Sequence, residues 1–182
     1  MRIIFLDRDG VINRFPGIGK YVTRPQDLKV LPQALKGMRL LSQAGYRLVV
    51  VSNQGCVSRG LLSRKDLDLM TRQMLRKVRA AGGKIHKVYY CLHQTSDHCD
   101  CKKPKTALFE KALKGFHGER SGVFVIGDSA EDIQAGHALG CRTILALSGR
   151  NRKKDVKRLP VKPHVIKKNL LEAATWLLKK RS

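Results

Sequence analysis

The sequence predicts a doubly wound α/β fold, in which a mainly parallel β-sheet carries helices on both faces. Three observations favour this fold class. Short apolar runs rich in β-branched residues recur along the chain, segments with helical spacing separate them, and the 182 residues match the common size of one domain. We therefore expect a single domain over residues 1–182.

Six apolar runs are the candidate strands. Near-continuous apolar runs are typical of strands that are buried on both faces of a parallel sheet. In chain order they are Ile3–Leu6, Leu48–Val51, Val88–Tyr90, Val123–Ile126, Thr143–Leu147 and a weaker run near Val165.

Four segments between these runs have apolar residues spaced as on one face of a helix. They cover Leu35–Ala44, Leu67–Val78, Ala107–Lys114 and Asp132–Leu139. Ser63 followed by Asp66 is a typical N-terminal cap for the second of them. Glycines are placed to end the first, second and fourth, at Gly45, Gly82-Gly83 and Gly140.

Polar side chains of reactive type follow the first four candidate strands, at the edge where open sheets of this kind bind ligands. Asp7 and Asp9 come directly after the first strand, and Asp128 follows the fourth. Carboxyl groups at strand ends can turn toward one point and form the oxygen-rich site that Mg²⁺ prefers. The sequence therefore predicts a magnesium site made by Asp7, Asp9 and Asp128.

This set of residues suits phosphoryl transfer. Asp7 is the candidate nucleophile, because a carboxylate can attack phosphorus and form an acyl phosphate that water then hydrolyses. Asp9 is the candidate acid and base for the leaving oxygen and the attacking water. Lys103 and Ser52 are candidates to offset the charge of the phosphoryl oxygens, together with Mg²⁺. Asp132 is expected to support the metal site rather than to bind the ion directly.

Four residues within eleven positions have the spacing of a zinc site. Cys91-x-His93 is followed after five residues by Cys99-x-Cys101. Three thiolates and one imidazole are a complete tetrahedral set for structural zinc, without an open position for catalysis. We therefore expect a zinc-clipped loop over residues 91–101, in which these four side chains bind Zn²⁺. The alternative is that Cys91 is a buried strand residue and the other cysteines are free thiols.

The segments DRDGV (7–11), SNQG (52–55), KKP (102–104) and GDSAED (127–132) resemble the four motifs of the haloacid dehalogenase-like phosphatases, in order and spacing, over nearly the whole chain. The resemblance implies a Rossmann-like sheet with the first strand central, in the order 5-4-1-2-3. It also implies an aspartyl phosphate on Asp7, an Mg²⁺ contact from the Asp9 backbone carbonyl, and metal binding by Asp128. Ser52 would bind phosphate and Lys103 would stabilise its charge. The segments between the motifs are too short for a large cap domain.

The cysteine loop narrows the resemblance to the zinc-containing D-glycero-D-manno-heptose 1,7-bisphosphate phosphatases and the related histidinol-phosphate phosphatases. Arg8 and the run CDCKKP at 99–104 match that group. By this resemblance the substrate-binding residues are Asn53, Gln54, Arg59 and Lys102. Lys102 departs from the pattern, since heptose phosphatases often have an arginine there, and a lysine keeps the charge but lacks the bidentate fork.

The predicted activity is Mg²⁺-dependent phosphomonoester hydrolysis, with D-glycero-D-manno-heptose 1,7-bisphosphate as the favoured substrate and the 7-phosphate as the group removed. Histidinol phosphate and a polynucleotide 3′-phosphate are the alternative substrates. A basic, zinc-bearing protein that binds without catalysis is the alternative of another class. The formal net charge of +23 keeps nucleic acid as a partner to be tested, although a small sugar bisphosphate is favoured.

Charge and hydropathy also suggest where the protein works. Residues 149–182 carry twelve lysines and arginines against two acidic residues, and the stretch Arg150–Lys157 within them is expected to be a surface loop. The longest apolar runs are far short of the ~20 residues that cross a bilayer, and the N-terminus lacks the pattern of a signal peptide. We expect a cytoplasmic monomer without a membrane partner.

Overall fold

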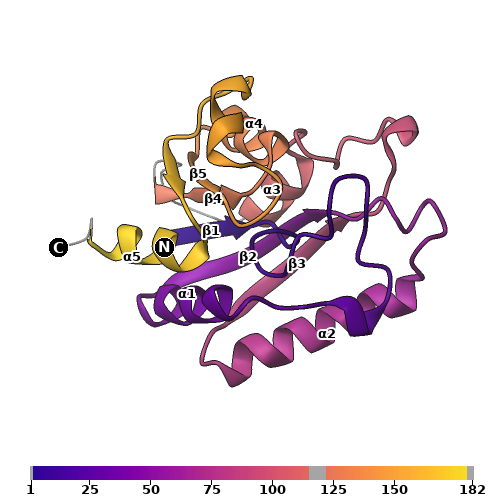
Figure 1. The fold of residues 1–182 in the computed structure, drawn as a ribbon, viewed down its shortest axis with the longest axis horizontal. Helices are drawn as coiled ribbons and strands as arrows, with labels where there is room; N and C mark the ends of the chain where they lie inside the picture. Colours follow the sequence, from indigo (N-terminus) through magenta and orange to yellow (C-terminus); the bar gives the residue numbers. More distant parts are fainter. Residues whose placement is uncertain (1, 115–121, 180–182) are drawn as a thin grey trace.

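The computed structural model describes residues 2–114 and 122–179, which form a six-stranded, fully parallel sheet (Figure 1). The strands are β1 (Arg2–Leu6), β2 (Tyr46–Asn53), β3 (Ile85–Cys91), β4 (Phe124–Gly127), β5 (Arg142–Ala146) and β6 (Val165–Lys167). Their order, β3-β2-β1-β4-β5-β6, has β1 in the interior of the sheet. The expected order of five strands is confirmed, and the weak run near Val165 extends it at one edge as β6.

Helices pack against both faces of the sheet, which confirms the doubly wound arrangement. The main helices described are α1 (Pro32–Gln43), α2 (Arg64–Ala80), α3 (Ala107–Leu113), α4 (Ala130–Ala138) and α5 (Leu170–Lys179). Ile4 and Leu6 of β1 belong to the core that also contains α1, α2 and α5. Ile3 and Phe5 belong to the core that contains α3 and α4. Successive strand residues point to opposite faces, so β1 supplies both cores.

Helix α5 was not among the predicted elements. Its N-terminus is capped by Asn169, whose side chain accepts a hydrogen bond from the Glu172 backbone N–H at 3.1 Å. The helix packs so closely on α1 that a Cβ on Gly37 would lie 2.8 Å from the Leu170 carbonyl oxygen. Asn169 followed three residues later by Glu172 was a readable helix-start signal before an apolar run.

The predicted helix ends are confirmed. The Ser63 hydroxyl accepts from the Asp66 backbone N–H at 3.0 Å, as an N-terminal cap does. Gly45 and Gly140 follow the ends of α1 and α4 with φ of 80° and 68°, a left-handed conformation that glycine adopts without the usual steric penalty. None of the described helices combines the length and apolar character that crossing a bilayer requires.

The stretch Arg150–Lys157, expected to be a surface loop, lies largely on the surface but contains regular secondary structure. Lys153–Arg158 form a 3-10 helix, which begins where the Arg152 backbone N–H donates to the Asp155 carboxylate at 2.8 Å. Asn151 ties the start of the segment to the sheet by donating to the Asp128 carbonyl at 2.8 Å. Asp155 thus accepts the hydrogen bond that starts the helix, within an otherwise basic stretch. Residues 180–182 of the predicted basic segment lie outside the described residues.

Candidate active site

A cavity of about 340 Å³ lies at the carboxyl ends of β1, β2 and β4, where open α/β sheets bind ligands. Most of the residues predicted for catalysis and substrate binding line it. These are Asp7, Asp9, Ser52, Asn53, Arg59, Lys102 and Lys103. The predicted metal ligand Asp128 lies in the same wall.

Lys103 lies at the centre of the site and joins three elements. Its ammonium group donates to Asp7 Oδ1 at 2.8 Å, to Asp132 Oδ1 at 2.6 Å and to the Val51 carbonyl at 2.8 Å. Burial alone lowers the pKa of this lysine, but the Asp132 and Asp7 carboxylates raise it above its ordinary value. Lys103 is therefore a fixed cation beside the candidate nucleophile.

The carboxyl groups of this site are crowded and poorly hydrated. Burial raises the pKa of Asp7 to about 6, because the loss of water and the repulsion from Asp132 and Asp9 outweigh the attraction of Lys103. Burial also raises the pKa of Asp128 well above its ordinary range, and the charge of Asp7 adds to that effect. One lysine does not neutralise this group, so the site favours a further cation.

The donor set fits Mg²⁺. Asp7, Asp128 and Asp132 each offer one carboxylate oxygen, and these oxygens all lie within 4.8 Å of one another. Mg²⁺ uses one or two such carboxylates and completes its shell with water and phosphate oxygens. Gly10 and Gly149 allow the Asp128 carboxylate its position, since a Cβ on either residue would overlap it.

The Asp9 carboxylate lies apart from these three, contrary to the expectation that Asp7 and Asp9 turn toward one point. It accepts hydrogen bonds from Arg8 at 2.9–3.2 Å, from Asn13 at 2.7 Å and from Gln54 at 2.9 Å. Burial raises the pKa of Asp9, but the hydrogen bonds and the charge of Arg8 lower it by a larger amount. The pKa of Asp9 is therefore below its ordinary value. Because its carboxylate is engaged by these donors, Asp9 would contact a metal ion through its backbone carbonyl.

Gln54 does not line the cavity, contrary to its predicted role in substrate binding. Its side chain is 1% exposed and lies beneath the floor. It accepts from the Arg8 guanidinium at 2.8 Å and donates to the Ser52 hydroxyl at 3.2 Å and to Asp9. Gln54 thus links the residues that follow β1 and β2. The sequence could not separate a residue that touches substrate from one that orients its neighbours.

Three other predicted residues form the rim, each with a protein partner. Asn53 exchanges two hydrogen bonds with the Lys103 backbone, at 3.0 and 3.2 Å, and so positions that lysine. The Lys102 ammonium group donates to Thr95 Oγ1 at 3.0 Å. The Arg59 guanidinium lies 5.7 Å from the centre of the Tyr21 ring.

Two parts of the cavity wall were not predicted. One is the loop Phe15–Tyr21, in which Ile18 is 78% exposed between two glycines of positive φ. The other is an ion pair of 3.3 Å between Glu131 and Arg150. The Gly-Ile-Gly sequence shortly after DRDGV was the available signal for the loop. The ion pair brings together residues 19 positions apart, which no local pattern indicates.

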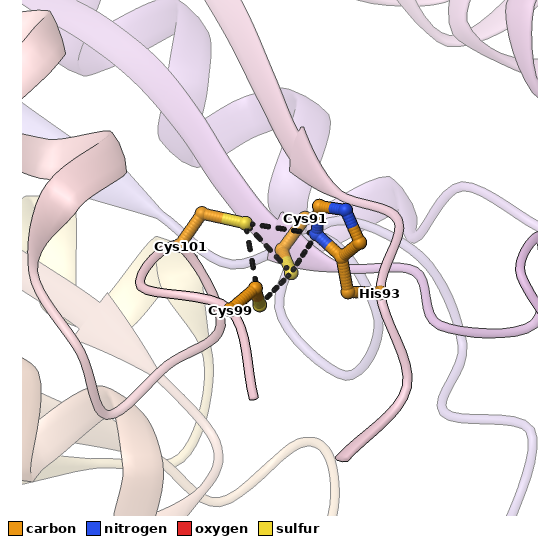
Figure 2. A group of neighbouring side chains, drawn as sticks. All are labelled: Cys91, His93, Cys99 and Cys101. Atoms are coloured by element: carbon orange, nitrogen blue, oxygen red, sulfur yellow. Dashed lines mark hydrogen bonds between the residues drawn. The ribbon is translucent and has the colours of Figure 1, made fainter. Parts of the chain in front are cut away.

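The predicted zinc ligands converge on one point (Figure 2). The Cys101 sulfur lies 3.1 Å from that of Cys91 and 3.5 Å from that of Cys99, and the last two are 3.6 Å apart. His93 Nδ1 lies 3.2 Å from the Cys101 sulfur and 3.8 Å from the Cys91 sulfur. Tetrahedral zinc with bonds of about 2.3 Å separates its sulfur ligands by roughly 3.8 Å, close to these distances. The four residues therefore fit Zn²⁺.

Comparison with known proteins identifies the relatives of this chain. A family model described as HAD-hydrolase-like matches residues 100–173. The chain is 35% identical over 153 residues to D-glycero-beta-D-manno-heptose-1,7-bisphosphate 7-phosphatase of Neisseria meningitidis, covering 84% of this chain and 81% of that protein. Identity to the Pseudomonas aeruginosa protein of the same name is 31% over 158 residues, with coverage of 87% and 88%.

A solved structure shares the whole fold. The crystal structure of D,D-heptose 1,7-bisphosphate phosphatase from B. bronchiseptica, complexed with magnesium and phosphate, aligns with a TM-score of 0.91 at 30% identity and covers 99% of both chains. Fold, site geometry and sequence identity agree. The chain belongs to the haloacid dehalogenase-like phosphatases, in the group that contains the D-glycero-D-manno-heptose 1,7-bisphosphate 7-phosphatases.

Proposed function

We propose that the protein removes the 7-phosphate of D-glycero-D-manno-heptose 1,7-bisphosphate through an aspartyl phosphate on Asp7. The observation that carries the proposal is the buried contact of Lys103 with Asp7 and Asp132 at the floor of the cavity. The named relatives supply the substrate, since they are phosphatases of this sugar bisphosphate. The proposed chemistry therefore rests on the geometry of the site, and the proposed substrate rests on the relatives.

The side chains present account for both halves of the reaction. Asp7 attacks phosphorus, and a bond to its carboxylate oxygen forms as the ester bond to the sugar oxygen breaks. Asp9 gives a proton to that leaving oxygen. Asp9 then takes a proton from water, which attacks phosphorus, breaks the bond to Asp7 and releases inorganic phosphate. Lys103 and the Ser52 hydroxyl offset the charge of the phosphoryl oxygens.

Both metal sites have a role in this scheme. Asp7, Asp128 and the Asp9 carbonyl would hold Mg²⁺, which supplies positive charge against the phosphoryl oxygens. Asp132 instead orients Lys103, and it accepts a hydrogen bond from the Ser129 hydroxyl at 2.7 Å. Cys91, His93, Cys99 and Cys101 would hold Zn²⁺ as a closed structural site. When bound there, zinc would tether the loop that leads directly into Lys102 and Lys103.

The rim suits a second phosphate group on a small substrate. Arg59 and Lys102 lie on the cavity wall with Lys103 at its floor, which gives positive charge at two depths. A bisphosphate presents negative charge at both ends, so its distal phosphate would lie against Arg59 and Lys102. Asn53 contributes indirectly, through its hydrogen bonds with the Lys103 backbone.

The deciding experiment compares kcat/KM for three substrates: the heptose bisphosphate, histidinol phosphate and a 3′-phosphorylated oligonucleotide, each at 50 and 200 mM salt. We expect the heptose bisphosphate to exceed the others by at least ~100-fold, which corresponds to roughly 2.7 kcal/mol of transition-state stabilisation. Its rate should depend little on salt. An oligonucleotide that is preferred at low salt and loses its advantage at high salt would overturn the substrate assignment.

A further inference from the structure

A row of basic side chains runs along the outer face of α2 and has no role in the proposed reaction. At 100° per residue, Lys65, Arg72, Arg76 and Arg79 fall within about 40° of one line along the helix. All four are exposed. The buried residues of α2, Leu67, Met70, Met74 and Val78, lie on the opposite side. We call these four basic residues the basic row; it is about 21 Å long at 1.5 Å per residue.

The positive charge of the basic row is not balanced by ion pairs among the described residues. Among the ion pairs of residues 2–114 and 122–179, none includes a member of the row. The acidic residues of α2 are already engaged, because Asp66 caps the helix with Ser63 and Asp68 pairs with Arg64. Arg76 lies four residues after Arg72 and three before Arg79, spacings at which like charges destabilise a helix. An external polyanion would remove that repulsion.

The position of α2 leaves the basic row accessible. Figure 1 shows the helix along an outer margin of the molecule, with α1 and the sheet on its inner side. Its N-terminus follows the carboxyl end of β2, and its C-terminus precedes the start of β3, at the amino ends of the parallel strands. A partner on the row could therefore be held without covering the phosphatase cavity.

We propose that the basic row is a docking surface for double-stranded nucleic acid, which it holds through the phosphate backbone. A duplex presents fixed rows of phosphates, and a helix fits its major groove. Helix α2 contains no aromatic residue that could stack on the bases of a single strand. Its apolar face is buried in the core, so it is not free to enter a lipid surface. The net charge of +23 would favour encounter with such a partner.

The test is fluorescence anisotropy with a labelled 20-base-pair duplex between 50 and 200 mM salt. We expect R72Q/R76Q/R79Q to bind at least tenfold more weakly at 50 mM. Its slope of log affinity against log salt should fall by roughly 2.7, at about 0.9 per lost phosphate contact. R72K/R76K/R79K, which keeps the charge, should remain within threefold of wild type. Hydrolysis of the small substrate should not change in either variant.

The matched control is K153Q/K154Q/R158Q, which removes three exposed charges from the 3-10 helix at the other end of the sheet. It should remain within threefold of wild type. Equal weakening by the control and by R72Q/R76Q/R79Q would show that only net charge matters and would overturn the proposal. So would a wild-type protein that does not bind the duplex at 50 mM salt, or that binds anionic vesicles through the row but not the duplex. Circular dichroism of each variant confirms that α2 is intact.

Discussion

At the scale of single residues, the site is defined by how one lysine and four carboxyl groups share a buried space. Lys103 holds Asp7 and Asp132, whereas Arg8 holds Asp9 at a separate point. This separates the candidate nucleophile from the candidate acid and base, although the two are only two residues apart. The Arg8 contacts favour the ionised form of Asp9, which suits a base in the second half-reaction, whereas the first half-reaction requires Asp9 to carry a proton when substrate is bound.

Replacing the nucleophile tests the proposed chemistry. Asp7→Asn should lower turnover on the order of 10³-fold or more while the fold is retained, because the amide keeps the shape but cannot form the acyl phosphate. Single-turnover kinetics with the preferred substrate gives the rate. Asp27→Asn, which replaces an exposed residue that pairs with Arg24, is the control and should not alter it. Turnover of Asp7→Asn within tenfold of wild type would exclude the mechanism.

The raised pKa of Asp7 predicts a pH dependence of magnesium binding. The folded-state pKa of about 6 exceeds the ordinary 3.8, so without metal the protein is more stable when Asp7 is protonated and loses that contribution as pH rises from about 4 to 6. Mg²⁺ must displace this proton. Affinity should therefore fall as pH decreases through 6, by up to tenfold per pH unit for the Asp7 proton and more steeply where the Asp128 proton is also displaced. Calorimetry at pH 7.5, 6 and 5 measures it, and equal affinity at all three would contradict the assignment.

At the scale of elements, one loop and one helix contact complete the framework around the sheet. The cysteine loop joins the end of β3 to Lys102 and Lys103, so its shape sets the position of the central lysine. Helix α5 packs closely on α1 at Gly37, where there is no side chain to separate the two helices. The α1–α5 contact joins segments far apart in the sequence, whereas the four candidate zinc ligands lie within eleven residues.

Removing one ligand tests the zinc site. Cys99→Ser should abolish stoichiometric zinc, lower the melting temperature and reduce kcat, because the loop that carries Lys103 would lose its tether. Elemental analysis and thermal melting provide the measurements. Cys141→Ala is the control, since Cys141 is buried outside the cluster and its replacement should leave the zinc content unchanged. Wild-type protein without zinc would rule the site out.

The α1–α5 contact makes a separate prediction. Gly37→Ala should destabilise the protein by about 1–3 kcal/mol, because the added methyl group would push against the Leu170 carbonyl and displace α5. Gly122→Ala is the matched control, since a Cβ there has no atom within 4 Å. Urea unfolding of both variants gives the comparison. Equal stability of Gly37→Ala and wild type would mean that α5 packs less closely than described.

At the scale of the whole molecule, 37 basic residues against 14 acidic residues make mutual repulsion a property of the folded state. Salt screens such repulsion over about 10 Å at 0.1 M. We expect the melting temperature to rise as potassium chloride increases from 20 to 300 mM, because the compact state gains more from screening than the expanded chain. Potassium phosphate at matched ionic strength should stabilise further by occupying the cavity. A melting temperature that falls with chloride would show that local ion pairs outweigh the repulsion.

The sequence by itself determined the alternation of strands and helices, the carboxyl-end residues and the zinc spacing, because these follow from local periodicity and short motifs. Tertiary structure decided which carboxylates face each other. The turn into α4 places Asp132 beside Asp7 and Asp128. Hydrogen bonds from Arg8 and Gln54 hold the Asp9 carboxylate at a separate point. It also decided that Gln54 is buried and that Arg150 meets Glu131. Periodicity and spacing report what each segment prefers, but the direction of a side chain at a strand end depends on distant partners that only the packed sheet brings within reach.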